Sequence, residues 1–274
     1  MKIRFNILLL ATLFASACNN SDTRAKDNND SEEEFHIPAP LLLNYQVLNQ
    51  FPHDTLSFTE GLNFFNGQLY ESTGYPSDET STNQSWVGPI DLQSGKYQKK
   101  VDLGTSYFGE GTTFLNGRMY QLTYKTGIGF VYDDKTFKKL KTFNYKGEGW
   151  GLTNDGKNLI MSNGSSNLYY LDPDSLRFIS MLPVQDNNGY DSNINELEYI
   201  DGYIYANQWL TPNILKIDPR TGYVVAKMDL SKIANEIKAK YPDAAEMNGI
   251  AHDSASKKTY ITGKKWPFIY QISW

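Results

Sequence analysis

The sequence predicts an all-β fold, a five-bladed β-propeller with one short inserted helix. The first observation behind this prediction is a unit that recurs about every 40 to 50 residues, the period at which propellers repeat their blades. The second is an Asn-Gly or Asp-Gly pair in each of the first four units, because such pairs accept the positive φ values of tight β-turns. The third is the alternation of apolar and polar residues beside these pairs, which is typical of β-strands.

Each unit opens with a short motif rich in acidic residues, asparagine or glycine. The motifs are Phe58-Thr59-Glu60-Gly61-Leu62, Phe108-Gly109-Glu110-Gly111-Thr112, Glu148-Gly149-Trp150-Gly151-Leu152, Asn195-Glu196-Leu197-Glu198-Tyr199 and Asn248-Gly249-Ile250-Ala251-His252. The turn pairs are Asn66-Gly67, Asn116-Gly117, Asp155-Gly156 and Asp201-Gly202. We expect strands at 68–72, 87–92, 118–124, 129–133, 158–162, 168–172, 203–208, 214–218, 258–262 and 268–272. An irregular β-sandwich is the alternative, but it would not repeat one order of motif, turn and strand five times.

The ring needs a strand from the other end of the chain. The fifth unit stops at Trp274 with too few strands for a blade, so we expect residues 44–51 to complete it and to remove an exposed sheet edge. A helix is expected in the fourth unit, with Ser231 as its N-cap and Pro242 at its end. The residues that share its apolar face are Ile233, Ala234, Ile237 and Tyr241.

The start of the chain predicts an exported lipoprotein. Residues 1–17 have a basic start, an apolar run and small residues directly before Cys18, which indicates a lipoprotein signal peptide. A simply cleaved secretory signal is the alternative. Residues 18–34 are polar and predict a disordered tether, which leaves 35–274 as the propeller domain. We therefore expect a lipid on Cys18 and a protein that faces the periplasm or the cell exterior.

The overall composition limits the classes of partner that the protein can bind. A net charge of −5 gives no basic footprint for nucleic acid. Cys18 is the only cysteine, so no intramolecular disulfide can form. Aromatic residues make up 14% of the chain and suit pockets for sugars or peptides. We expect a monomer that contacts a membrane only through its lipid anchor.

Polar residues gather at the expected mouth of the central channel, because the innermost strand of each blade lines that channel. They are Glu60, Glu110, Glu148, Asn195, Glu196 and Asn248. Carboxylates around one axis raise one another's pKa, and a purely structural propeller has no need of that cost. The alternative is that some of these acids brace neighbouring blades through backbone amides. Aromatic residues fall in the same segments and are either core residues or pocket walls: Phe58, Phe108, Tyr124, Trp150, Trp209 and Trp266.

These motifs resemble those of the plant and bacterial glutaminyl-peptide cyclotransferases. The resemblance covers nearly all of 45–274 and includes the run Gly263-Lys264-x-Trp266-Pro267 near the end. It implies a five-bladed propeller that converts an N-terminal glutamine to 5-oxoproline, with loss of ammonia and without a metal. The family's functional residues fall on Phe58, Glu60, Phe108, Glu110, Tyr124, Trp150, Asn195, Trp209 and Lys264.

Two of these positions depart from the plant pattern. Glu60 stands where glutamine is found and Tyr124 where tryptophan is found. Both changes keep polarity or aromaticity, so we expect an altered pocket rather than lost activity.

The residue types fit this reaction. The α-amine must be neutral to attack the γ-carboxamide, and a carboxylate with a weakly raised pKa can carry its proton to the departing ammonia, a role we assign to Glu110. Lys264 is the cation suited to stabilise the oxyanion, and Asn195 is suited to bind the substrate amide. Glu60 is suited to hold the amine. The aromatic residues would hold the substrate folded for ring closure.

No cofactor or metal is expected. The three histidines, His36, His53 and His252, show no ligand spacing, and no glycine-rich phosphate loop precedes a helix. Two other functions stay open: a propeller lipoprotein that binds a peptide or glycan without turnover, and a metal-dependent hydrolase or lactonase.

Overall fold

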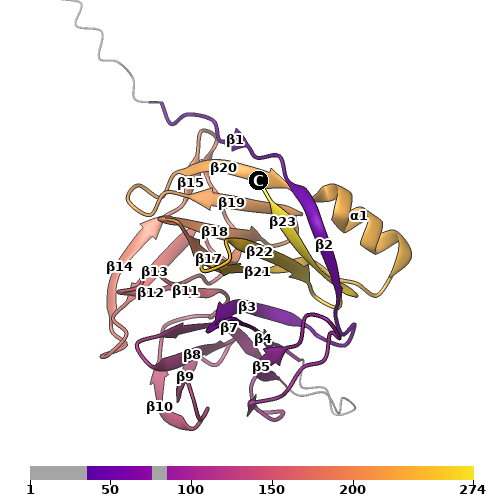
Figure 1. Cartoon of the computed structure of the whole chain (residues 1–274). Coiled ribbons are helices and arrows are strands. Elements are labelled where there is room, and N and C mark those ends of the chain that lie inside the picture. The colour runs from indigo at the N-terminus through magenta and orange to yellow at the C-terminus, as the bar shows by residue number, and fades with distance from the viewer. Residues whose placement is uncertain (1–35, 76–84) are drawn as a thin grey trace, which may run out of the picture. The chain divides into compact units, whose positions relative to one another are not determined.

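The computed structural model describes residues 36–75 and 85–274. Within these residues the chain forms five sheets of four or five strands, a two-stranded hairpin and one helix (Figure 1). The predicted signal peptide, the tether and Cys18 lie outside the described residues. No helix in the described part has the length and apolar character needed to cross a bilayer.

The five sheets are the blades of a propeller. Blades 1 and 2 consist of β3 (Thr59–Phe65), β4 (Gln68–Thr73), β5 (Trp86–Ile90) and β6 (Val101–Asp102), and of β7 (Gly109–Leu115), β8 (Arg118–Thr123), β9 (Ile128–Asp133) and β10 (Lys139–Asn144). Blade 3 consists of β11 (Leu152–Asn154), β12 (Leu159–Met161), β13 (Asn167–Leu171) and β14 (Phe178–Pro183).

Blade 4 consists of β17 (Ile194–Ile200), β18 (Tyr203–Gln208), β19 (Asn213–Ile217), β20 (Val224–Asp229) and a short parallel strand, β1 (Leu41–Leu42). Blade 5 consists of β21 (Met247–Asp253), β22 (Lys258–Gly263), β23 (Phe268–Ser273) and β2 (Gln46–Pro52). The hairpin of β15 (Gln185–Asp186) and β16 (Gly189–Tyr190) lies between blades 3 and 4 in the chain. Neither this hairpin nor β1 was predicted from the sequence, because both are too short to show a period.

The first strand of each blade forms the inner ring. Strand β3 contacts β7, β7 contacts β11, β11 contacts β17, β17 contacts β21, and β21 contacts β3 again. The predicted closure is confirmed, because β2 pairs antiparallel with β23 (Figure 1). Segments near the two ends of the described chain therefore share one sheet. Strand β2 is the fourth strand of blade 5 and covers the edge of β23.

Most predicted hairpin turns have the expected backbone. Asn66 and Gly67 both have positive φ, 50° and 76°, which is the type I′ geometry that joins twisted strands. The Asp155-Gly156 pair differs from the prediction. Strands β11 and β12 are separated by four residues, 155–158, and the Asp155 carboxylate accepts hydrogen bonds from the backbone N–H groups of Lys157 and Asn158. This Asx turn replaces the two-residue turn.

The helix α1 (Ser231–Lys240) lies on the outside of the ring beside blades 4 and 5. Its predicted N-cap was wrong by position. Leu230 occupies the N-cap without a side-chain bond, and Ser231 is the first helical residue. The backbone N–H of Ser231 instead donates to the Asp229 carboxylate at 2.8 Å, so an acid two residues upstream satisfies this N–H. Ile233 and Ile237 are buried as predicted, whereas Tyr241 is largely exposed.

The core lies between blades. The buried apolar side chains of the described residues form five clusters, and each cluster joins two neighbouring blades. Leu62 of β3 belongs to the cluster between blades 1 and 5, where it contacts a group containing Leu69, Ala251 and Ile269. Packing across this junction therefore joins the first blade to the last.

We expect Leu62→Ala to lower the free energy of unfolding by about 2–5 kcal/mol, because it leaves a cavity at a fully buried position. Leu140→Ala is the matched control, since Leu140 is 52% exposed, and its effect should stay within about 0.5 kcal/mol. Urea unfolding of the two variants followed by circular dichroism checks this. Equal losses in both variants would contradict the assigned core.

Candidate active site

One cavity brings the predicted site residues together. It has a volume of about 280 Å³. All nine residues predicted from the sequence line it, together with Glu246: Phe58, Glu60, Phe108, Glu110, Tyr124, Trp150, Asn195, Trp209 and Lys264. Lys264 and Glu110 are separated by more than half of the domain in sequence and face the same hollow. The fold therefore brings Glu110 and Lys264 to one cavity, as the predicted cyclisation requires.

Five aromatic side chains form a continuous wall around this cavity. Neighbouring ring centroids lie 6.0 Å apart for Phe58 and Phe108, and 5.6 Å apart for Phe108 and Tyr124. The wall continues from Tyr124 to Trp150 at 6.5 Å and from Trp150 to Trp209 at 5.4 Å. The wall therefore runs from blade 1 to blade 4, and blade 5 adds Lys264 and Glu246 to the cavity.

Two glycines make room for this wall. A Cβ on Gly74 would lie 2.0 Å from the ring of Phe108, and a Cβ on Gly164 would lie 2.6 Å from the ring of Trp150. Gly164 also has φ +78°, a conformation that side chains other than glycine rarely adopt. These glycines fix where the rings can lie.

The charged side of the cavity is an ion pair. The Lys264 Nζ lies 2.8 Å from the Glu60 Oε1, and both side chains are almost completely buried. Asn248 Nδ2 donates to the other carboxylate oxygen of Glu60 at 3.1 Å. The Lys264 ammonium also lies 4.7 Å from the centroid of the Phe58 ring, which is at one end of the aromatic wall. Glu60 is thus held on both oxygens, while Lys264 keeps further N–H groups for a ligand.

The second carboxylate of the cavity has no cation of its own. Burial raises the pKa of Glu110 well above its ordinary value, and the charge of Glu60 raises it further. Burial also raises the pKa of Glu60, to about 7, against the opposing effect of Lys264. For Lys264, burial lowers the pKa, but the two carboxylates outweigh it and the net shift is upward. Lys264 is shared by Glu60, Glu110 and Glu246, and Glu110 is the acid suited to hold a proton.

A β-bulge aims these side chains at the axis. The strand register shifts between Thr59 and Gly61, and again between Gly109 and Thr112, so Glu60 and Glu110 lie at the irregularities. Asn195 lies at a third shift, between Ile194 and Leu197. A bulge re-aims a side chain and is common beside active sites. The predicted motifs are therefore the bulged starts of inner strands.

Asn195 offers an unused hydrogen-bonding atom. Its side chain is buried, and its Oδ1 has no partner among the described residues. A buried carbonyl oxygen without a partner is costly, and a ligand N–H would satisfy it.

Glu196 is a brace between blades, as the alternative interpretation of the sequence held for some of these acids. The Glu196 carboxylate accepts hydrogen bonds from the backbone N–H of Leu62 at 3.3 Å and of Ile250 at 2.9 Å. Glu196 therefore ties blade 4 to blades 1 and 5. Glu148 accepts from Trp150 Nε1 at 3.0 Å and orients that ring. Trp266 is a core residue rather than part of the wall.

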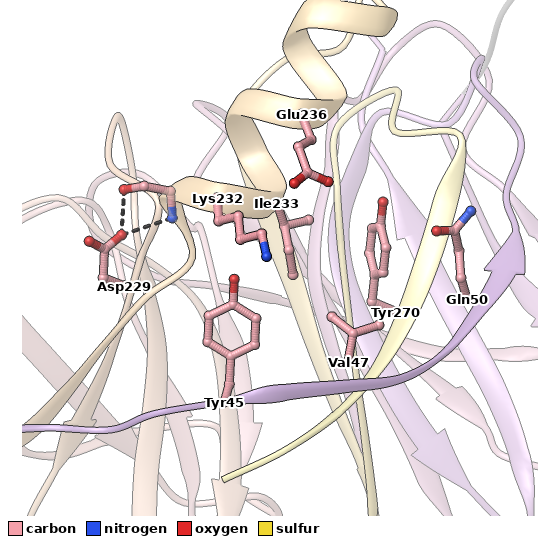
Figure 2. A pocket seen from close by; sticks show the side chains of 9 residues that line it. Tyr45, Val47, Gln50, Asp229, Lys232, Ile233, Glu236 and Tyr270 are labelled. Carbon is pink, nitrogen blue, oxygen red and sulfur yellow. Dashed lines mark hydrogen bonds between the residues drawn. The ribbon is translucent and has the colours of Figure 1, made fainter.

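A larger hollow beside α1 does not include any of these groups. It measures about 580 Å³ and lies between β2, α1 and Tyr270. Figure 2 shows Tyr45 and Tyr270 below the helix, with Glu236 and Lys232 above them. Its charged side chains, Asp229, Lys232 and Glu236, are all exposed, so it lacks the buried charged groups of the smaller cavity.

Comparisons with known proteins agree with the motifs. A family model described as glutamine cyclotransferase matches residues 12–274. The chain is 37% identical to the glutaminyl-peptide cyclotransferase of Arabidopsis thaliana over 230 residues, which cover 83% of this chain and 70% of that relative. The chain belongs to the glutamine cyclotransferase family. The crystal structure of Myxococcus xanthus glutaminyl cyclase superposes with a TM-score of 0.78 at 32% identity, and covers 85% of this chain and 97% of that one.

The two departures from the plant cyclotransferases both fit the cavity. Glu60 is matched by the Lys264 charge and by Asn248, so its extra negative charge is compensated. Tyr124 contacts both Phe108 and Trp150, so the wall remains continuous with a smaller ring.

Glu246 is the cavity residue of this cyclotransferase that sequence reasoning missed. It precedes Asn248 by two positions, as Phe58 precedes Glu60 and Phe108 precedes Glu110. The register of the repeat thus contained the signal. Blades 1 and 2 have phenylalanine at this position, so the acid in blade 5 was not recognised as its equivalent.

The described histidines have other partners. His252 Nδ1 lies 2.9 Å from Thr259 Oγ1, and His53 lies in a buried cluster beside the cavity. Among residues 36–75 and 85–274, no group of three or more His, Cys, Asp or Glu side chains could hold a metal ion.

Glu198 gives a test of the buried acids. Burial raises its pKa to about 8, although the backbone N–H of His252 donates to it. The folded protein therefore keeps a proton that the unfolded chain loses above about pH 4.5. This favours the fold below that pH and is lost as the pH rises, until about pH 8.

We expect the free energy of unfolding to fall less steeply between pH 5 and pH 8 in Glu198→Gln than in the wild type. The difference in slope should approach about 1.4 kcal/mol per pH unit. Urea unfolding over this range measures it. Glu236→Gln, which removes an exposed carboxylate of α1, is the control and should keep the wild-type slope. A Glu198→Gln slope equal to that of the wild type would contradict a protonated Glu198.

Proposed function

We propose that this chain is a glutaminyl-peptide cyclotransferase, which converts the N-terminal glutamine of peptides or proteins to 5-oxoproline and releases ammonia. The observation that carries the proposal is the buried pair of Lys264 and Glu60 beside Glu110, within an aromatic cavity. The cavity volume suits one folded glutamine side chain rather than a longer ligand. Membership of the family supports the same reaction.

The reaction forms one C–N bond and breaks another. The neutral α-amine attacks the γ-carboxamide carbon, the C–N bond of the ring forms, and the carbonyl oxygen becomes an oxyanion. The tetrahedral intermediate then collapses, the bond to the γ-nitrogen breaks, and ammonia leaves. One proton moves from the α-nitrogen to the departing nitrogen, so a carboxyl group that can both accept and donate suffices.

Glu110 is the group we assign to this transfer. Its pKa is raised further than the weak shift expected from the sequence, because burial and Glu60 act together. A positively charged α-ammonium in the cavity would lower that pKa and favour transfer of its proton to Glu110. Glu110 then passes that proton to the leaving nitrogen and accepts the second proton of the α-nitrogen as the ring closes, so the products are the lactam, ammonia and a protonated Glu110. Lys264 would stabilise the oxyanion, because its ammonium is already oriented by Glu60 before substrate binds.

The remaining lining residues would bind the substrate. Asn195 Oδ1 would accept a hydrogen bond from a substrate N–H. The five rings of the wall would exclude water and hold the glutamine side chain folded, since ring closure gains from an enforced conformation. Glu246 adds negative charge beside Lys264 and would favour a substrate with a positively charged amine.

We expect Glu110→Gln to lower the rate of ammonia release from a Gln-initiated peptide by roughly 10²–10⁴-fold, because the variant cannot carry the proton. Glu198→Gln is the matched control, since it removes a buried carboxylate that does not line the cavity, and it should keep near-wild-type turnover. Circular dichroism checks that both variants fold. A near-wild-type rate in Glu110→Gln would mean that another group carries the proton.

The same assay with a chelator separates the other functions. Ammonia from the wild type in the presence of chelator supports cyclisation. No ammonia under any condition would favour a binding propeller. Ammonia that disappears only with chelator would favour a metal enzyme.

We also propose that the chain is exported and held on a bacterial membrane by a lipid on Cys18. The support is the signal-like sequence before the only cysteine. After metabolic labelling with an alkyne fatty acid, the wild type should carry the label and Cys18→Ser should lose it. Ser16→Ala should keep the label. An unlabelled wild type would contradict the proposal.

A further inference from the structure

A second buried pair, His53 and Glu71, is bonded to the chain segments that carry Lys264 and Glu60. His53 Nε2 is 3.2 Å from Glu71 Oε1, and the two side chains are 1% and 0% exposed. Neither residue lines the cavity. His53 follows β2 in the chain and Glu71 belongs to β4, so the pair joins the closing strand of blade 5 to blade 1.

The hydrogen bonds around His53 and Glu71 suit a charged pair. Ser57 Oγ donates to Glu71 Oε2 at 3.1 Å, and Thr59 Oγ1 donates to Glu71 Oε1 at 2.6 Å. His53 Nδ1 donates to the backbone oxygen of Trp266 at 2.9 Å, since a carbonyl only accepts. Beside an acid that accepts from both hydroxyls, an imidazolium His53 can donate from both ring nitrogens, to Trp266 and to Glu71.

The titration of His53 agrees with this assignment. Burial lowers its pKa, but the charge of Glu71 and its hydrogen bond outweigh burial, and the net shift is upward.

Glu71 holds the strand that carries Glu60. Its carboxylate binds Ser57 and Thr59, the residues on either side of Phe58. Successive side chains of a strand point to opposite faces, so Thr59 faces Glu71 while Glu60 faces the cavity. A shift of the Glu71 carboxylate would therefore move Phe58 and Glu60 together.

His53 holds the turn that carries Lys264. Its ring binds the backbone oxygen of Trp266, and its backbone N–H donates to the oxygen of Pro267 at 2.9 Å. Lys265 N–H donates to the oxygen of Ser57 at 2.7 Å, which links the same turn to the segment before β3. The residues next to Lys264 are thus tied to the residues next to Glu60.

We propose that His53 and Glu71 are positioning residues, which set the distance and orientation of Lys264 relative to Glu60. The inference rests on the proposed cyclisation, because only a reaction makes this orientation matter. Neither residue touches the substrate, and both act through the two strands that they hold. A misplacement of about 1 Å in an active site can lower a rate by roughly 10²-fold, so a small loss of restraint has a measurable effect.

Three conservative variants test the roles of His53 and Glu71 separately. His53→Asn places an amide N–H near the Nδ1 position and keeps the bond to Trp266. His53→Gln places one near the Nε2 position and keeps the bond to Glu71. Glu71→Gln keeps the size of the side chain and removes its charge. We expect each to lower kcat roughly 10- to 100-fold with KM changed by less than about threefold, because the pocket stays intact while the charges lose their alignment.

The double variant His53→Gln/Glu71→Gln should be no slower than the slower single variant, since both residues act through one pair. Asp186→Asn is the matched control. It weakens a partly buried ion pair, with Lys227 at 2.7 Å, in a part of the molecule that does not line the cavity. Its kcat should equal that of the wild type even where its melting temperature falls.

Rates are measured at a temperature at which circular dichroism shows each variant fully folded. If a variant of the pair fails to fold, Thr59→Val removes one bond to Glu71 and should lower kcat in the same direction by a smaller factor. Folded variants with wild-type kcat, or an equal loss of kcat in Asp186→Asn, would overturn the proposal.

Chemical labelling provides a readout that does not depend on activity. Lys264 is 6% exposed, and a limiting dose of acetic anhydride should label it far more slowly than the exposed Lys257. Peptide mass spectrometry should show faster labelling of Lys264 relative to Lys257 in the His53 and Glu71 variants, and an unchanged ratio in Asp186→Asn. An unchanged ratio in all variants would overturn the positioning role even if the wild type cyclises glutamine. A changed ratio in the variants, together with a wild type that releases no ammonia, would overturn the proposed function instead.

Discussion

The close approach of the inner strands around the propeller axis is the constraint on which the site depends. A Cβ on Gly111 would lie 2.4 Å from the backbone nitrogen of Leu152, and a Cβ on Gly151 would lie 2.1 Å from the oxygen of Asn195. Only glycine fits between strands at this separation. Gly111 and Gly151 therefore let their inner strands pack closely on the next one, and the residue before each glycine, Glu110 or Trp150, lines the cavity.

The converging inner strands bring several buried carboxylates close together, and the molecule stabilises them in two ways. Glu196 keeps its buried carboxylate satisfied by backbone N–H groups of two other blades and contributes to closure of the ring. Glu60 is instead satisfied by Lys264 and Asn248, beside a cavity that a ligand can enter. Glu110 has neither solution, and its raised pKa is the consequence. The acid that the fold satisfies least is the one with the protonation suited to proton transfer.

The repeat in the sequence predicted both the blades and the cavity residues, because each depends on a local pattern. Motif, turn and strand follow one another within a single unit, so the strands were placed within a few residues and the motif side chains were expected at one channel mouth. Errors arose where a neighbouring carboxylate changed the expected local geometry. Asp229 binds the N–H of Ser231, which is the first helical residue rather than the N-cap, and residues 155–158 join β11 and β12 through an Asx turn rather than a two-residue turn. Glu246 was missed because its unit replaces an aromatic residue with an acid.

The sequence by itself determined the number of blades, the residue types at the start of each inner strand and the closure of the ring by residues near 44–51. These follow from periodicity, turn chemistry and the need to pair a sheet edge. Only the tertiary structure decided which acid is a brace, which is paired and which is left to hold a proton. That division depends on burial and on partners from other blades, such as Lys264 and the N–H of Ile250, which are close in space and far apart along the chain.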